Sequence, residues 1–280
     1  MQIKVPATIG DFGPGKASIG LALDLWLTVT VLEETTEWVV NHNLGESIPT
    51  DATNYIVAVA NKLAPGLTPH KLSVESDIPL QRGLGSSTAA LMAAIELADQ
   101  LGGLGLDDFT KLTLAARTEG QPANVSAALL GGVTTSYLQN GDYFGSQIVT
   151  PPYDVIVYEP TERVLLGQAA ENITMTTAID AAAAGNMLFA AWQSNQYVLA
   201  GQLLENDSLV PEITSDLAVI RQATHALDVF GTTQVGNKGT IAIFVAPEQT
   251  QDMLDVLAHV EVAGTFSKVE LATTGLLVTA

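Results

Sequence analysis

The first 30 residues of the chain alternate between apolar and polar side chains, as strands do. One face of the stretch 21–34 collects the apolar positions Leu25, Leu27, Val29 and Val31. A second β-rich stretch covers residues 2–8, and a loop with several glycines separates the two. Because a period of two is the signature of a half-buried strand, the pattern predicts two strands joined across residues 9–20.

Between residue 40 and residue 140 the apolar spacing changes to that of helices in several places. A strand is expected at 70–80. Residues 121–138 predict a loop, a short helix and a Gly-Gly turn that leads into a second strand. Helices are predicted over 48–63, capped near Thr50 or Asp51, over 86–101, closed by Gly102 and Gly103, and over 106–120. Glu96, within the second of these, is expected on its solvent-facing side.

Two consecutive prolines, Pro151 and Pro152, precede a new strand and reset the pattern. We place a domain boundary here, which divides the chain into 1–150 and 151–280. The second half predicts helices at about 175–205 and 211–228, a strand at 240–246, a helix from about Glu248 and a closing strand at 267–280. Strands and helices in this order predict an α+β protein of two domains.

Composition limits what such a protein can bind. The 280 residues include 30 acidic and 11 basic side chains, which gives a net charge of −19 at pH 7. A surface of this charge repels phosphate backbones, so no nucleic-acid partner is expected. The chain has no cysteine and no apolar run long enough for a bilayer, and its N-terminus does not resemble a signal peptide. We therefore expect a cytoplasmic protein without a membrane partner.

The stretch "PLQRGLGSSTAAL", residues 79–91, places glycines and hydroxyls where a helix begins. Glycines allow close approach of the backbone to a ligand, and the first amides of a helix attract anions, phosphate above all. The hydroxyls of Ser86, Ser87 and Thr88 can cap the helix, donate to phosphate or ligate Mg²⁺. A plain capped helix after a turn explains the same residues, and neither the P-loop pattern nor the dinucleotide fingerprint is present.

Three motifs in order carry a family resemblance. The quoted stretch resembles the second motif of the GHMP small-molecule kinase superfamily. "VPATIGDFGPGKASIGLAL", residues 5–23, is similar to the first motif in its homoserine kinase form. "EGQPANVSAALLGGV", residues 119–133, resembles the homoserine kinase segment Glu-Gly-His-Pro-Asp-Asn-Val that ends in Leu-Leu-Gly-Gly. The resemblance covers nearly the whole chain.

The resemblance implies a fold, two cofactors and a reaction. The fold is an N-terminal domain like ribosomal protein S5 and a ferredoxin-like C-terminal domain, with ATP at their junction. The reaction is transfer of the γ-phosphoryl group to a small alcohol, L-homoserine first of all, in threonine biosynthesis. Ser87 and Glu119 match the Mg²⁺ ligands. The nucleotide would contact Arg82, Gly83, Leu84, Gly85, Ser86, Ser87 and Thr88.

On the acceptor side the resemblance implies fewer residues. Asn124 matches the asparagine near the acceptor, and Arg163 resembles the arginine that holds the substrate carboxylate. Asp11 stands where the family has asparagine, and we expect it to contact substrate. Lys16 resembles the lysine of a Pro-Gly-Lys motif in related kinases and is expected to face the γ-phosphate or the acceptor. Lys16, Asn124 and Asp11 are therefore the candidate catalytic residues.

Departures from the family pattern concentrate at the acceptor. Ala17 and Ala123 stand where homoserine kinases carry aspartates, and Arg221 is the only nearby candidate for a second substrate arginine. The third motif has become "VGNKGT", which brings in Lys238. Two alternatives therefore stay open, a kinase of the same fold for another alcohol and a catalytically silent nucleotide-binding homologue. The sequence also leaves a homodimer open.

Overall fold

The alternating stretch at the N-terminus forms the centre of a seven-stranded sheet. β1 (Gln2–Ile9) and β2 (Ile19–Glu34) pair antiparallel, and the strand order is β11-β1-β2-β4-β3, with β5 and β6 attached through β2. The remaining members are β3 (Val39–His42), β4 (His70–Ser76), β5 (Val133–Gln139), β6 (Asp142–Ile148) and β11 (Leu277–Thr279). Among the strand pairs of the described residues, only β3 and β4 run parallel.

A four-stranded antiparallel sheet follows in the order β10-β7-β9-β8. Its strands are β7 (Asp154–Pro160), β8 (Thr232–Val235), β9 (Thr240–Val245) and β10 (Gly264–Glu270). In this computed structural model the described residues are 1–162, 164–166, 173–210, 212–225, 227 and 229–279. Arg163, the expected substrate arginine, lies outside them.

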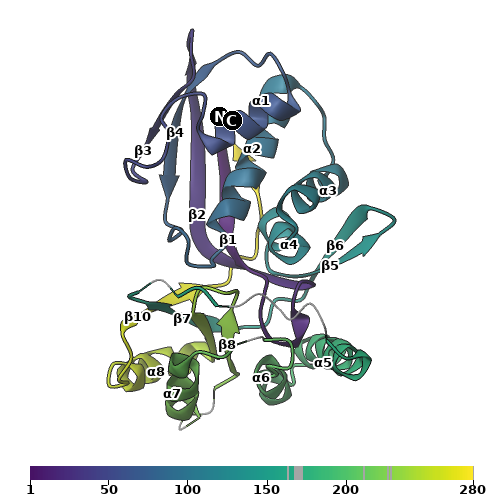
Figure 1. The fold of residues 1–280 in the computed structure, drawn as a ribbon, viewed down its shortest axis with the longest axis vertical. Helices are drawn as coiled ribbons and strands as arrows, with labels where there is room; N and C mark the ends of the chain where they lie inside the picture. The colour runs from purple at the N-terminus through teal and green to yellow at the C-terminus, as the bar shows by residue number, and fades with distance from the viewer. Residues whose placement is uncertain (163, 167–172, 211, 226, 228, 280) are drawn as a thin grey trace.

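Helices cover one side of each sheet (Figure 1). Those of the first sheet are α1 (Tyr55–Leu63), α2 (Ser86–Gly102), α3 (Asp108–Glu119) and α4 (Pro122–Leu130). Those of the second are α5 (Met175–Gln193), α6 (Tyr197–Leu204), α7 (Ser215–Thr224) and α8 (Thr250–Leu257). Two short 3₁₀ turns are η1 (Gly13–Gly15) and η2 (Pro247–Gln249). None of the helices in the described ranges is both long and apolar enough to span a bilayer.

The α+β class expected from the sequence is confirmed, and several expected boundaries were wrong. The helix expected at 175–205 is two helices, because Asn195 takes a positive φ of 56° and ends the first one. Asn54 caps α1 in place of Thr50 or Asp51, and its side chain accepts a hydrogen bond from the amide of Ile56 at 3.1 Å. The expected closing strand is broken into β10 and β11.

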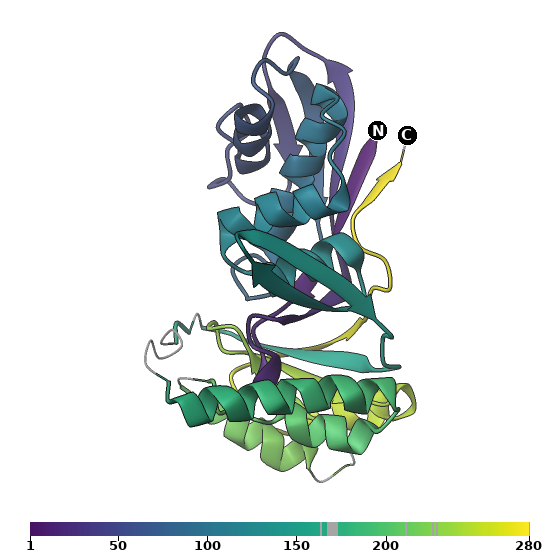
Figure 2. The ribbon, with the colours of Figure 1, turned by 90° about the vertical axis from the view of Figure 1, so that its right-hand side faces the viewer.

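The last strand returns to the first sheet. β11 pairs with β1, with Ile3 opposite Val278, so the two ends of the chain lie side by side (Figure 2). The change between the sheets falls between β6 and β7, close to residue 150, and the boundary there stays our proposal for where the domains divide.

The largest cluster of buried apolar side chains extends from the first sheet into the second. Phe12, just after β1, is 1% exposed, and its ring centroid lies 6.4 Å from that of Phe244 on β9. The carbonyl of Pro14 lies 3.3 Å from where a Cβ of Gly185, on α5, would stand. The loop between β1 and β2 therefore packs against the second half of the molecule.

Candidate functional site

The glycine loop of residues 81–85 is pinned to β1 and leads directly into α2. The amide of Thr8 donates to the carbonyl of Leu84 at 3.0 Å, and the Leu84 side chain is buried in the core. Gly85 has a φ of 73°, and a Cβ there would lie 2.1 Å from Thr8 Oγ1, so only glycine fits. Gly85 is the N-cap of α2 and has no side chain. No capping side chain therefore accepts a hydrogen bond from the first backbone amides of the helix.

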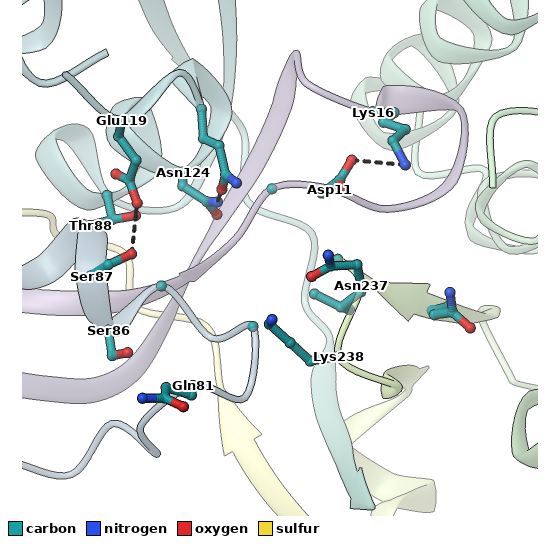
Figure 3. Close-up of a pocket in the computed structure, with 17 residues that line it drawn as sticks. Asp11, Lys16, Gln81, Ser86, Ser87, Thr88, Glu119, Asn124, Asn237 and Lys238 are labelled. Atoms are coloured by element: carbon teal, nitrogen blue, oxygen red, sulfur yellow. Dashed lines mark hydrogen bonds and ion pairs between the residues drawn. The ribbon is translucent and has the colours of Figure 1, made fainter. Parts of the chain in front are cut away.

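A cavity of about 520 Å³ opens in front of this helix start. Four segments line it: the loop after β1, the glycine loop with the start of α2, the turn between α3 and α4, and the loop between β8 and β9. The first three segments belong to the half with the larger sheet, and the fourth belongs to the other half (Figure 3). The expected ligand site at the junction of the halves therefore has an open cavity.

Glu119, the last residue of α3, reaches the start of α2 from the side. Its Oε1 accepts hydrogen bonds from the hydroxyls of Ser87, at 2.8 Å, and Thr88, at 2.7 Å (Figure 3). Burial raises the pKa of the Glu119 carboxyl, and the two hydroxyl donors offset this only in part. Ser87 and Glu119, 32 positions apart in the chain, are thus direct neighbours, as the family resemblance implied.

Three buried side-chain oxygens lack a hydrogen-bond partner among the described residues, and all three belong to this region. They are Glu119 Oε2, Asn124 Oδ1 and Thr8 Oγ1. Glu119 and Asn124 line the cavity, and Thr8 lies directly under Gly85. Buried polar atoms are nearly always paired, so a cluster of unpaired ones points to a ligand.

The donor set at Glu119 suits Mg²⁺ better than a softer metal. One carboxylate oxygen without a partner lies beside two hydroxyls. Within the described residues, no group of three or more His, Asp or Glu side chains forms a complete metal cage. Mg²⁺ commonly takes one or two carboxylates and completes its shell with substrate phosphates and water, so these residues fit it.

Asn124 and Gln121 occupy the turn between α3 and α4. Asn124 Nδ2 donates to Gln121 Oε1 at 2.6 Å, and the residue is 7% exposed. Its side chain approaches β1 so closely that a Cβ on Gly10 would lie 2.7 Å from Asn124 Oδ1. The neighbouring Ala123 is buried, with its carbonyl against Gly20, where a Cβ would lie only 2.1 Å away.

Asp11 and Lys16 lie at the side of the cavity away from Ser87 and Glu119 (Figure 3). Lys16 Nζ is 3.4 Å from Asp11 Oδ1. The carbonyl of Asp11 accepts a hydrogen bond from the amide of Gly236 at 2.8 Å, which ties this loop to the opposite half. Lys16 therefore points to Asp11, on the side of the cavity away from Ser87 and Glu119.

Lys238 enters from the loop between β8 and β9. Its Cβ and Cγ lie 3.9 Å from where a Cβ of Gly83 would stand, so its stem crosses the glycine loop. Its amine has no ion-pair partner among the described residues. In a chain of net charge −19, an unpaired ammonium beside an anion cradle is a favourable position for phosphate.

Other residues singled out from the sequence lie apart from the cavity lining. Arg82 donates to the carbonyl of Pro160 at 2.6 Å and lies 3.7 Å from Glu159, so its guanidinium joins the two halves. Arg221 pairs with Asp207, with Nη2 and Oδ1 2.9 Å apart. The side chain of Leu84 is enclosed in the core. Arg82, Arg221 and Leu84 are therefore not among the described residues that line the cavity.

The structure adds cavity residues that sequence patterns did not indicate. Gln81 lines the cavity and takes a φ of 61°, although it is not a glycine. Gln234 and Asn237 line it from the second half. Isolated amide side chains have no spacing signal, and only the neighbouring "VGNKGT" motif marks the position of Asn237.

Comparison with known proteins gives consistent matches along the whole chain. Residues 54–132 match the model of the GHMP kinases N-terminal domain. The chain is 36% identical to a homoserine kinase of Leuconostoc mesenteroides, covering 100% of this chain and 99% of the relative. It is 41% identical to a homoserine kinase of Limosilactobacillus fermentum, covering 86% and 87%. The solved structure of a protein assigned as a homoserine kinase, from Listeria monocytogenes, superposes with a TM-score of 0.92 at 34% identity and covers 100% of this chain and 99% of that one.

Proposed function

The chain belongs to the GHMP kinase family, among its homoserine kinases, and from this premise we propose that it transfers the γ-phosphoryl group of ATP to the side-chain hydroxyl of L-homoserine. One observation supports the proposal above the others. At the start of α2, the unpartnered Glu119 Oε2 and the hydroxyls of Ser87 and Thr88 border an open cavity. Such a site suits a metal-bound triphosphate.

The triphosphate lies on the glycine loop and the first amides of α2. Gly83 and Gly85 let the backbone come close, and the positive end of the helix dipole faces the anion. Lys238 adds a full positive charge from the opposite half. Arg82 acts indirectly, since its guanidinium holds the loop against β7.

Ser87 and Glu119 would hold the Mg²⁺ ion. When bound, Mg²⁺ neutralises charge on the transferring phosphoryl group. The deprotonated Glu119 is the required form, and its unpartnered Oε2 is the atom available for the cation. The hydrogen bonds from Ser87 and Thr88 keep the carboxylate in one orientation.

Asn124 orients the acceptor hydroxyl. Its Oδ1 has no partner among the described residues and can accept the hydroxyl proton in a hydrogen bond, which directs an oxygen lone pair toward phosphorus. Ala123, beside it, offers no carboxylate base. Positioning and charge neutralisation therefore carry the reaction, as is general for phosphoryl transfer.

ADP release measures this function directly. Wild-type protein with ATP, Mg²⁺ and L-homoserine should release ADP in step with O-phosphohomoserine. Glu119→Gln should lower kcat by roughly 100-fold or more, because a metal contributes several kcal/mol to the transition state. The matched control is Glu33→Gln, an exposed glutamate on β2 far from the cavity lining, and it should leave the rate unchanged.

Two results would contradict the proposal. ADP release with other alcohols and none with L-homoserine would indicate a kinase for a different acceptor, in keeping with Ala17 and Ala123. ATP binding without turnover on any alcohol would indicate the silent homologue. A homodimer and a cytoplasmic location stay predictions from the sequence.

A further inference from the structure

We infer that Asp11 and Lys16 together recognise the amino-acid end of the acceptor. The Asp11 carboxylate binds the α-ammonium group, and the Lys16 ammonium binds the α-carboxylate. This inference rests on the proposed function and names the residues that select its acceptor. The two residues lie on one loop and together bind both charges of a zwitterionic alcohol.

The charged side chains of the cavity leave few other choices. Among the described residues that line it, Asp11 and Glu119 are the only carboxylates, and Lys16 and Lys238 are the only cations. Glu119 is held by two hydroxyls at the start of α2, and the Lys238 stem lies across Gly83. Both belong to the phosphate end, so Asp11 and Lys16 remain for the acceptor.

The pair has unused hydrogen-bonding capacity. Lys16 Nζ carries three donors, and its only ion-pair partner among the described residues is Asp11, at 3.4 Å. The Asp11 carboxylate can accept several hydrogen bonds, and this contact uses one oxygen. The side chains are 18% exposed for Lys16 and 33% for Asp11, so each is partly desolvated yet reachable from the cavity.

A neutral pair of opposite charges is complementary to a zwitterion and to little else. An ammonium and a carboxylate on one carbon atom place their charges a few ångströms apart, which matches the spacing of the pair. Each substrate charge then faces its opposite, and the desolvation cost of one charge is offset by the other. An alcohol with a single charge leaves one member of the pair facing an uncharged group.

The loop that carries the pair is held rigidly. The Asp11 carbonyl is bound by the Gly236 amide at 2.8 Å, and Phe12 is buried against the second sheet. Ala17 directly after Lys16 takes a φ of 63°, in the left-handed region that costs free energy for any residue with a Cβ. Strain retained beside a cavity is typical of a functional position. The two charges are therefore preorganised before the acceptor arrives.

The test compares L-homoserine with two analogues that each lack one charge. 4-Hydroxybutanoate has no ammonium group, and 3-aminopropan-1-ol has no carboxylate. Dissociation constants are measured calorimetrically for wild type, Asp11→Asn and Lys16→Met with Mg²⁺ and a non-hydrolysable ATP analogue, and KM and kcat are measured with ATP. The control variants are Glu33→Gln and Lys71→Met, which remove an exposed ion pair of 3.3 Å between β2 and β4.

Asp11→Asn should weaken the binding of L-homoserine about 10- to 100-fold, because it removes a charge-assisted hydrogen bond. It should leave the dissociation constant of 4-hydroxybutanoate unchanged. Lys16→Met should weaken the binding of L-homoserine by a similar factor and leave the dissociation constant of 3-aminopropan-1-ol unchanged. Both should raise KM for the acceptor more than they lower kcat, with ATP affinity retained. The two control variants should resemble wild type for all three compounds.

Two kinds of failure are distinguishable. If wild type phosphorylates L-homoserine and both variants keep the full preference for it over the analogues, the pair is not the selector. If the preference for a carboxylate is lost in Arg163→Ala and kept in Lys16→Met, the assignment of Lys16 is overturned. A wild-type protein that neither binds nor phosphorylates L-homoserine contradicts the proposed function, and this inference with it.

Discussion

In the proposed metal site, the protonation state of Glu119 decides whether a cation can bind. Burial raises the pKa of its carboxyl above the ordinary glutamate value. A raised pKa means that the folded protein retains the proton to higher pH than the unfolded chain does. Folding stability from this group is therefore fully present below the unfolded pKa and is lost as the pH rises through the folded one.

Cation binding has the opposite pH dependence, because Mg²⁺ needs the carboxylate. As the pH falls from neutrality through the raised pKa of Glu119, the extra thermal stabilisation that Mg²⁺ gives to the ATP complex should shrink progressively. The measurement is the midpoint of thermal unfolding with ATP, with and without Mg²⁺, across this range. Glu119→Gln is the control for the ionisation of ATP itself and should show little Mg²⁺-dependent stabilisation at any pH. A pH-independent Mg²⁺ effect in wild type would contradict the role of Glu119.

Site residues were predictable from the sequence where a motif fixes the backbone. Ser87 and Glu119 meet, as the three motifs and the family resemblance that they carry implied. Arg82 was expected at the nucleotide, yet its guanidinium binds Pro160, 78 positions away along the chain. A contact over such a separation depends on how the halves pack, which local pattern does not encode.

At the scale of elements, the start of α2 depends on a glycine that touches β1. Gly85→Ala should cost about 2–5 kcal/mol of unfolding free energy, since it adds a clash with Thr8 to the strain of a left-handed alanine. Gly103→Ala, at the other end of the same helix, is the matched control. Its φ is 60° and nothing lies within 4 Å of the added Cβ, so it should cost only about 1–2 kcal/mol.

Urea denaturation gives both free energies. ATP affinity should fall in Gly85→Ala and stay unchanged in Gly103→Ala, because only the former deforms the glycine loop. Equal losses of stability in the two variants would show that the contact with Thr8 does not constrain the loop.

The packing of α2 on α3 was not predictable from residue type alone. Glu96 was expected on a solvent-facing side of its helix, and this was wrong, since it is 2% exposed. Lys111 Nζ reaches it from α3 at 2.7 Å and also lies 2.9 Å from Asp99. Desolvation lowers the pKa of Lys111, but its hydrogen bonds to the two carboxylates outweigh this and raise it overall. A charge can be buried where a partner compensates it, and the partner here lies on another helix.

At the scale of the whole molecule, the shared core should make the two halves unfold together. Trp38 is buried in the first half and Trp192 in the second, and both belong to one continuous apolar cluster. We expect a single cooperative transition, with a calorimetric enthalpy equal to the van't Hoff enthalpy. In Trp26→Phe/Trp38→Phe, fluorescence reports on Trp192 and should change at the same urea concentration as the far-ultraviolet circular dichroism. Separate midpoints for the two signals would indicate halves that unfold independently.

The two-domain α+β architecture followed from the sequence because periodic segments and the prolines near residue 150 are local signals. The return of β11 to the first sheet did not, since its three residues pair with β1 at the opposite end of the chain. β3 and β8, of four residues each, were likewise too short to give a periodic signal. The long elements that position the site were the predictable ones.

The proposed reaction depends above all on the start of α2 holding the triphosphate of ATP in front of Glu119. A crystal structure with Mg²⁺ and a non-hydrolysable ATP analogue tests it most directly. We expect phosphate oxygens within hydrogen-bonding distance of the backbone amides of residues 85–87, and Mg²⁺ bound to Glu119 and Ser87. A nucleotide bound elsewhere, or phosphates that do not contact the start of α2, would contradict it.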